Sequence, residues 1–233
     1  MIQLGKYFVY LLTKRIINTM FYYICNEKIG NLLLYLAEKI QNLHLTKLLK
    51  IIYIIDETAV RETGVPVTWL DYQVWEYAPV PKDLYEGLMN GEIEMHQYNL
   101  LYNKFNLNKF VKVERKINLS NKQADSFAIF PNAKFDDGEF NDYEMELIDK
   151  TIDTYKTLSS EQIISQLHEK GTLWGKMVNS KALQRNFWFK GNRSNYTIDF
   201  TDLLEEDSYK AMAYKAAYEA IIFQKELRML AKY

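Results

Sequence analysis

Cysteine is nearly absent from the chain, since only Cys25 among the 233 residues is a cysteine. No disulfide can form within the chain, and a reducing compartment is the simplest environment for such a protein. Nothing in the sequence marks the Cys25 thiol as an activated nucleophile. We therefore expect a cytoplasmic protein whose cysteine has no catalytic task.

Long apolar runs and an excess of one charge are also lacking. The N-terminal 25 residues are rich in apolar side chains, but their longest uninterrupted apolar run is about six residues, whereas a membrane span needs ~18–20. The 29 basic and 30 acidic residues leave a net charge of −1. Such a balance creates no overall field for nucleic acid or an acidic membrane. We expect neither a membrane nor a nucleic acid as partner.

One local segment departs from this balance, because basic and aromatic residues alternate in it. The aromatic run Phe187–Phe189 is interleaved with the basic residues Lys176, Lys181, Arg185, Lys190 and Arg193. Such a mixture can follow a single-stranded nucleic acid. The favoured interpretation is a solvated hairpin face over FWFKGNRSNYTIDF, residues 187–200.

Patterns for metal or phosphate binding are missing as well. The three histidines, His44, His96 and His168, have no metal-ligand spacing with each other or with the cysteine. No glycine-rich loop follows a predicted strand. We therefore predict no catalytic residue, no cofactor and no metal.

The chain does contain the material for a large core. Hydrophobic residues make up 48% of it and aromatic residues 15%, with 18 tyrosines and 12 phenylalanines, so aromatic side chains remain for surfaces. The central helix is predicted over TKLLKIIYIIDETAVRET, ended by Gly64. At ~100° per residue most of its apolar side chains share one arc, while Lys47 and Lys50 lie on the opposite arc.

Helical spacing recurs elsewhere and strand candidates are few and short. Two capping-box signatures, at Asn141–Glu144 and Ser159–Gln162, each precede a helical pattern. We predict an α+β fold: a predominantly helical single domain with a small antiparallel sheet. The expected organisation is a helical N-terminal extension (1–27), the domain (28–200, with an insertion at about 92–139) and a C-terminal helix (201–233, helical from Leu203).

An aromatic segment, VWEYAPVPKDLYEGL, follows the central helix. It is predicted as a strand over Asp71–Tyr77, a turn where Pro79 ends the strand, and a helix that begins at Pro81. Large side chains with few rotatable bonds anchor protein interfaces. The candidate partner-binding residues are therefore Trp69, Tyr72, Trp75, Tyr77, Pro79 and Tyr85.

Three segments in order resemble the Panacea/SocA-type antitoxin domain. LTKLLKIIYIIDETAVRETGVPV resembles the family's helix K-L-x-K-L-x-Y-x-x-D and the turn after it, and VWEYAPV resembles its strand ending in Gly-Pro-Val. FNDYEMELIDKTIDTYKTLSSEQIISQLHEKGTLW resembles its later helix pair, in which a histidine precedes a tryptophan. Ala78 stands where the family has glycine, at a turn that favours a positive φ.

Three polar or aromatic positions, Asp56, His168 and Trp174, are candidate structural residues. Asp56 falls in the middle of the apolar arc of the central helix, where an unpaired carboxylate is very costly. We expect it to accept backbone N–H groups, a Tyr or Trp donor, or to face a cation. Direct partner contact and catalysis are the alternatives.

The resemblance implies a non-enzymatic, antitoxin-like binding module. Its expected partner is a cognate toxin, which it either holds directly or delivers, as an adaptor, to a protease. A chaperone is a further class of expected partner. An alternative is a phage-associated protein that binds a host protein. A second alternative is a small hydrolase that uses Asp56 and His168 as an acid–base pair.

Overall fold

The computed structural model describes residues 27–91, 105–116, 126–169 and 171–230. Cys25, His96 and nearly all of the expected N-terminal extension lie outside them. Residues 27–39 are helical, and the α-helices that follow are α2 (Leu45–Thr63), α3 (Lys82–Asn90), α4 (Asp142–Tyr155), α5 (Ser160–Leu167), α6 (Leu173–Ser180), α7 (Leu183–Lys190) and α8 (Ser208–Leu230). The strands are β1 (Tyr72–Trp75), β2 (Ala78–Pro81), β3 (Val111–Lys116) and β4 (Ser126–Pro131), and short 3-10 turns cover Leu107–Lys109, Asp137–Glu139 and Phe200–Leu203.

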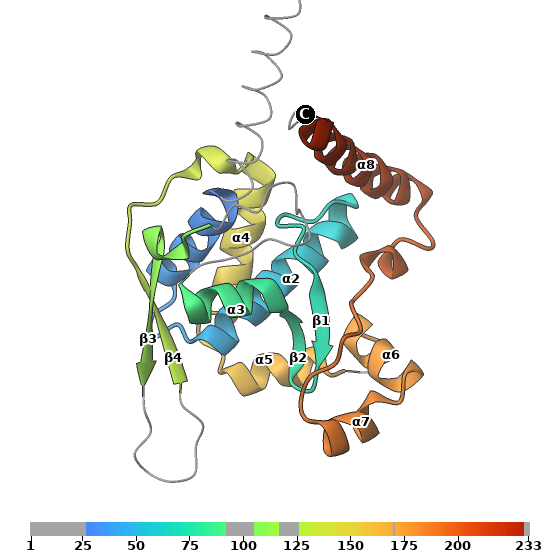
Figure 1. Ribbon diagram of the computed structural model, residues 1–233, viewed down its shortest axis with the longest axis horizontal. Coiled ribbons are helices and arrows are strands. Elements are labelled where there is room, and N and C mark those ends of the chain that lie inside the picture. The colour runs from blue at the N-terminus through green and yellow to red at the C-terminus, as the bar shows by residue number, and fades with distance from the viewer. Residues whose placement is uncertain (1–26, 92–104, 117–125, 170, 231–233) are drawn as a thin grey trace, which may run out of the picture.

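The predicted fold class, α+β and predominantly helical, is confirmed (Figure 1). The strands of the described residues form two antiparallel pairs, β1 with β2 and β3 with β4. The second pair lies in the expected insertion and is joined to the start of α2 by a hydrogen bond from Ile129 N to Leu43 O. Helices therefore form the body of the domain, and the small sheets are attached to it.

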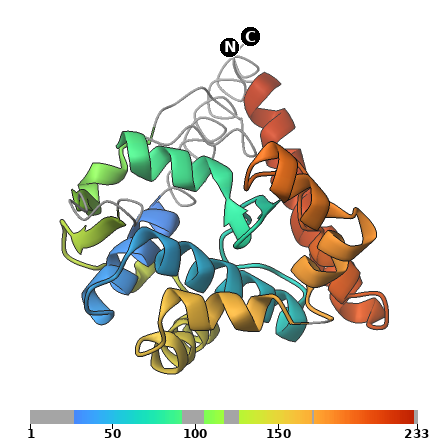
Figure 2. The ribbon, with the colours of Figure 1, turned by 90° about the horizontal axis from the view of Figure 1, so that it is seen from below.

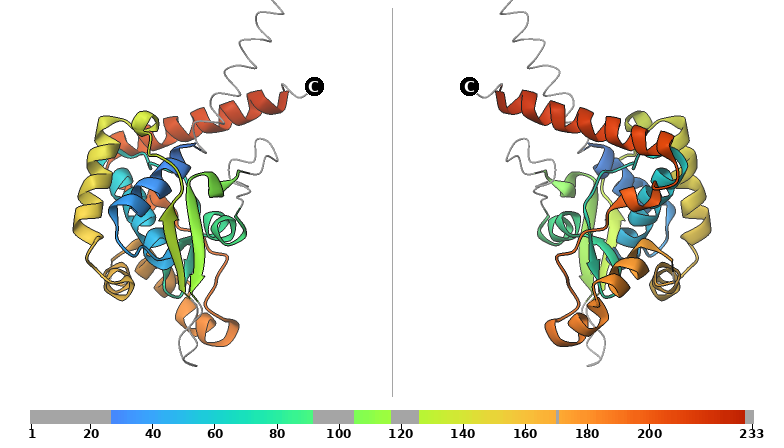
Figure 3. Two further views of the ribbon diagram at one scale, coloured as in Figure 1. Left: turned by 90° about the vertical axis from the view of Figure 1, so that its left-hand side faces the viewer. Right: turned by 90° about the vertical axis from the view of Figure 1, so that its right-hand side faces the viewer.

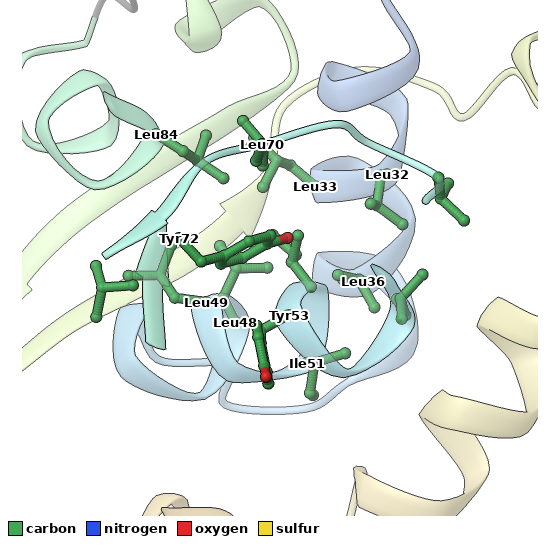
Figure 4. Packing of buried hydrophobic residues seen from close by; sticks show 14 of the residues in the cluster. Leu32, Leu33, Leu36, Leu48, Leu49, Ile51, Tyr53, Leu70, Tyr72 and Leu84 are labelled. Atoms are coloured by element: carbon green, nitrogen blue, oxygen red, sulfur yellow. The ribbon is translucent and has the colours of Figure 1, made fainter. Parts of the chain in front are cut away.

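Helix α2 is the centre of the core. It lies between α3 on one side and α4 with α5 on the other (Figure 2). Figure 4 shows its side chains packed against the helix over residues 27–39 and against the β1 and α3 segments, through Leu32, Leu33, Leu36, Leu48, Leu49, Ile51, Tyr53, Leu70, Tyr72 and Leu84. Because neighbours surround α2, its polar arc is enclosed too: Lys47 and Lys50 are both buried.

The helix ends follow the local signals. Both predicted capping boxes are present, at Asn141 with Glu144 and at Ser159 with Gln162. Each box satisfies backbone N–H groups that the first turn of a helix leaves unpaired. Gly64 ends α2 with φ of 83°, in the left-handed region, where glycine carries no Cβ penalty.

The segment after α2 is a hairpin followed by a helix, and not one strand followed by a helix. Glu76 and Tyr77 form its turn, and Pro79 lies inside β2 instead of ending the sheet. The second edge of β1 is occupied: Val74 N donates to Tyr196 O, and Ile198 N donates to Tyr72 O. Tyr72 and Val74 therefore direct their backbone hydrogen bonds away from β2. Because the bonds of an antiparallel ladder alternate along each strand, the β2 residues opposite Tyr72 and Val74 need no N–H toward β1. Those residues are Pro81 and Pro79, which explains how β2 accommodates two prolines.

Two other predictions were wrong near the C-terminus. Residues 187–200 do not form a hairpin: Phe187 to Lys190 end helix α7, and the chain then runs alongside β1, where Thr197 pairs with Gln73. The aromatic run therefore has helical spacing, with Phe187 buried and Trp188 87% exposed. The C-terminal helix begins at Ser208 and not at Leu203, because residues 200–203 form a 3-10 turn.

Helix α8 crosses one end of the domain and extends past its body (Figure 3). It docks where α2 ends: the Trp69 ring lies 5.3 Å from Tyr214 and 6.2 Å from Tyr218. A Cβ atom on Gly64 would overlap the backbone carbonyl of Lys210. Gly64 thus serves two purposes, the left-handed end of α2 and the close approach of α8.

This double constraint predicts that Gly64→Ala lowers the free energy of unfolding by more than the same substitution does at an ordinary left-handed helix end. Placing alanine at such a φ costs about 1 kcal/mol, and the overlap with Lys210 adds to it. Gly91→Ala is the matched control, because Gly91 ends α3 with φ of 76° and its Cβ would meet only the exposed side-chain amide of Asn108. Urea unfolding should show a larger loss for Gly64→Ala, and equal losses would contradict the close approach.

Candidate functional site

Asp56 is the most deeply buried carboxylate described, with no exposed surface. It accepts hydrogen bonds from the Thr68 backbone N–H at 2.8 Å, from the Tyr72 hydroxyl at 2.7 Å, and from the Thr68 hydroxyl. Burial raises the pKa of Asp56 to about 6, although these hydrogen bonds favour the charged form. The carboxylate therefore fastens the segment from Thr68 to Tyr72 onto α2.

Two lysines of the same helix also point inward. Lys50 is 2% exposed and donates to Pro79 O at 3.1 Å, while Lys47 donates to Lys156 O at 2.7 Å, at the C-terminal end of α4. Burial lowers the pKa of both, that of Lys50 to about 7. Neither contact was predicted from the sequence. The sequence does show that Lys47, Lys50, Tyr53 and Asp56 recur every three residues along the helix, but it does not indicate the carbonyl groups that accept from the lysines.

Ala78 begins β2 with φ of 112° and is fully buried. It is one of the few non-glycine residues with positive φ among those described. The next carbonyl along, that of Pro79, receives the Lys50 ammonium. The alanine that departs from the family's Gly-Pro-Val thus occupies a strained backbone position within the turn.

The side chains beside the turn form a stack. The Arg193 guanidinium lies 4.4 Å from the Trp75 ring centre and 5.5 Å from that of Tyr85, and the two rings meet edge to face at 5.3 Å. Trp174 Nε1 donates to Trp75 O at 2.8 Å. His168 stacks on the Trp174 ring at 3.7 Å, and burial with nearby Lys50 lowers its pKa. Trp174 therefore connects the α5–α6 region to the hairpin.

The acid–base pair required by the hydrolase alternative is not formed. Asp56 is sealed from solvent and its hydrogen bonds go to Thr68 and Tyr72. His168 Nε2 has no hydrogen-bond partner within the described part of the chain. The two side chains thus serve separate contacts.

The candidate partner-binding residues divide by exposure. Tyr72, Trp75 and Pro79 are buried, whereas Trp69 and Tyr85 are half-buried in the contacts described above. Tyr77, at the hairpin turn, is 55% exposed. Of the six, Tyr77 is thus the most exposed side chain.

Other exposed aromatic residues lie on the segments next to the hairpin turn that carries Tyr77, and the sequence did not indicate them. Glu76 N donates to Asn192 O, which brings the end of α7 beside the turn. Trp188 of α7 is 87% exposed and Tyr196 is 45% exposed, with the Lys181 ammonium 5.8 Å from the Tyr196 ring centre. We call Tyr77, Trp188 and Tyr196 the exposed corner. Only the hairpin and the helical course of α7 reveal it.

Metal and membrane chemistry receive no support from the residues in place. No group of three or more His, Cys, Asp or Glu side chains within the described ranges is arranged to hold a metal ion. None of the helices in these ranges combines the length and apolarity needed to cross a bilayer. The polar groups described above are instead engaged in holding backbone segments together.

The fold and these buried contacts define a mostly helical α+β domain. At its centre is α2, whose buried polar side chains hold a proline-containing hairpin. The chain belongs to the family described as antitoxin SocA-like, Panacea domain, whose model matches residues 48–175, more than half of the chain. The predicted resemblance is confirmed. No curated protein and no solved structure gives a significant match. The matched region contains Asp56, the hairpin, His168 and Trp174, and ends before α7.

The strain at Ala78 predicts an unusual response to glycine. Ala78→Gly loses a buried methyl group, worth ~0.8 kcal/mol, but relieves a backbone cost of roughly 1–3 kcal/mol. The free energy of unfolding should therefore stay unchanged or rise. Ala59→Gly is the control, because Ala59 is equally buried but lies inside α2, where glycine costs about 1 kcal/mol more. Similar losses for both variants would refute strain at Ala78.

Burial of Asp56 predicts a particular pH dependence of stability. Its pKa is about 6 in the folded protein against an ordinary 3.8, so between these values the folded form holds a proton that the unfolded form has released. The contribution of Asp56 to the free energy of unfolding therefore rises as the pH falls through 6 and levels off below 3.8. Asp56→Asn removes this rise.

The test is urea unfolding of wild type and Asp56→Asn from pH 7.5 down to 4.5. As the pH falls, the free energy of unfolding of the wild type should rise relative to that of Asp56→Asn. Asp202→Asn, at an exposed position, controls for the loss of one carboxylate. Parallel curves for wild type and Asp56→Asn would show that the Asp56 pKa is not raised.

Proposed function

We propose that the protein is an antitoxin that grips a cognate toxin at the exposed corner. Membership of an antitoxin family implies a protein partner such as a toxin and favours a non-enzymatic role. The observation that carries the choice of surface is Trp188, because a tryptophan that is 87% exposed is unusual unless a partner covers it.

The corner suits protein recognition for physical reasons. Tyr and Trp provide large contact areas at a low entropic cost. The turn that presents Tyr77 is anchored from behind, because Lys50 holds Pro79 O and Trp174 holds Trp75 O. An anchored surface loses little freedom when a partner docks. Lys181 beside Tyr196 favours an acidic rim on the toxin.

Both modes of neutralisation, direct holding and delivery to a protease, need this grip. They differ in the fate of the toxin. Direct holding leaves the toxin abundant and bound, whereas adaptor delivery shortens its half-life. The half-life of the toxin after translation is stopped, with and without the antitoxin, separates the two.

The test uses co-expression with the product of the adjacent gene. If that product arrests growth alone and the wild-type chain rescues growth, the toxin is identified. Tyr77→Ala with Trp188→Ala should then abolish rescue and weaken toxin binding by about 30-fold or more, the loss expected for hot-spot truncations of ~2 kcal/mol. The unfolding midpoint should change little, because both side chains face solvent.

Phe130→Ala is the matched control, since Phe130 is 40% exposed on the β3–β4 pair, and it should rescue fully. Normal rescue by the double variant would exclude the corner as the toxin-binding surface. If the neighbouring product is harmless, and the chain instead co-purifies with a host protein through Tyr77 and Trp188, the phage-associated alternative replaces the antitoxin role.

A further inference from the structure

Helix α8 has two different apolar faces. The inner face docks on the domain through Tyr214 and Tyr218 against Trp69. On the outer face, Tyr209 is 84% exposed, Met212 69% and Phe223 60%. Ala216 and Ala220 are exposed between them. We call these five residues the outer stripe.

The outer stripe is a regular feature of the helix. Its members follow each other at intervals of three, four, four and three residues. At ~100° per residue they fall within an arc of about 80° and extend over about 21 Å of helix. Contiguous exposed apolar surface of this kind marks a contact site, and the spacing is that of a helix that packs lengthwise against another helix.

Large side chains lie toward both ends of the outer stripe, and small ones lie between them. Large residues stand at both ends, Tyr209 with Met212 and Phe223, and the small Ala216 lies in the middle. If a second α8 lies antiparallel with its Ala216 facing Ala216, Tyr209 faces Phe223 and Met212 faces Ala220. The two aromatic rings then meet at each end of the contact, Met212 packs over the small Ala220 of the second copy, and the alanines allow the helices to approach closely.

The charges beside the stripe also suit an antiparallel pair. Lys215 and Glu219 lie along one flank, 3.8 Å apart within one chain. In this register Lys215 lies opposite Ala217 of the second copy, two residues or about 3 Å along the helix axis from the Glu219 of that copy, so the two side chains come within reach of each other and the reverse pair forms across the axis. Opposite charges therefore meet on this flank in the antiparallel register.

We propose that the outer stripe of α8 pairs with the same stripe of a second copy of this chain, antiparallel and centred on Ala216, to form a dimer. The contact is separate from the exposed corner, so it does not depend on toxin binding. The occupant of the stripe is another copy because the antiparallel pairing gives each large side chain of the stripe a partner and brings opposite charges within reach on its flank.

The first test is the oligomeric state of the full chain by analytical ultracentrifugation over a range of concentrations. The wild type should be a dimer, and Met212→Glu should raise the dimer dissociation constant at least about 10-fold, since it places charge in the stripe. Circular dichroism should show unchanged helix content. Trp188→Ala, an exposed aromatic outside the stripe, should leave the dimer intact.

The second test fixes the register by cross-linking, in a Cys25→Ser background. Ala216→Cys places two thiols at the two-fold axis, and mild oxidation should give a covalent dimer. Tyr209→Cys is the matched control: it is exposed on the same stripe, but in this register the two copies of position 209 stand about 21 Å apart, beyond disulfide reach. It should not cross-link.

Three outcomes would overturn the proposal. The wild type could be monomeric at every concentration, the dimer could be unaffected by Met212→Glu, or positions 209 and 216 could cross-link equally. A monomeric wild type whose toxin neutralisation is lost in Met212→Glu would assign the stripe to the toxin instead. Failure of the exposed-corner variants alone leaves the dimer proposal unchanged, because those residues lie outside the stripe.

Discussion

A carboxylate buried without solvent contact constrains the rest of this domain. Asp56 needs donors, and it obtains them from Thr68 and from Tyr72, the first residue of β1. Leaving the charge unpaired would cost several kcal/mol, so the turn after α2 and the start of the hairpin must stay on the helix. Lys50, nearly two turns away on the same helix, holds the other strand of the hairpin through Pro79 O. One helix therefore fixes both strands.

This anchoring decides which aromatic residues can meet a partner. Tyr72 is drawn inward by its bond to Asp56, and Trp75 is enclosed by Tyr85, Arg193 and the indole N–H of Trp174. The two residues of the turn are the part of the hairpin that these contacts leave outside. An aromatic-rich segment thus becomes mostly core, and the surface proposed for recognition includes α7 and residues 192–196, which approach from far along the chain.

Signals that act within a few residues could be read from the sequence. The capping boxes, Gly64 at the end of α2, and Asp56 as a carboxylate in need of donors all rest on local geometry. The wrong predictions concern long-range partners. The contact of Lys50 with the Pro79 carbonyl was not predicted because no local signal identifies that acceptor, and Pro79 was predicted to end a strand because the sequence does not show that residues 192–198 occupy the other edge of β1. Trp188 was assigned to a hairpin for the same reason.

The two surfaces proposed for binding lie at opposite ends of the molecule (Figures 1 and 3), with α8 at one end and α7 with the hairpin turn at the other. Pairing through α8 therefore leaves both exposed corners of a dimer open. Because Gly64 and Trp69 connect α8 to the end of α2, and Asp56 connects α2 to the hairpin, the two surfaces share one rigid helix. A dimer built in this way would hold two toxin molecules at fixed separation, so any toxin that is itself paired would be bound with the added strength of two simultaneous contacts.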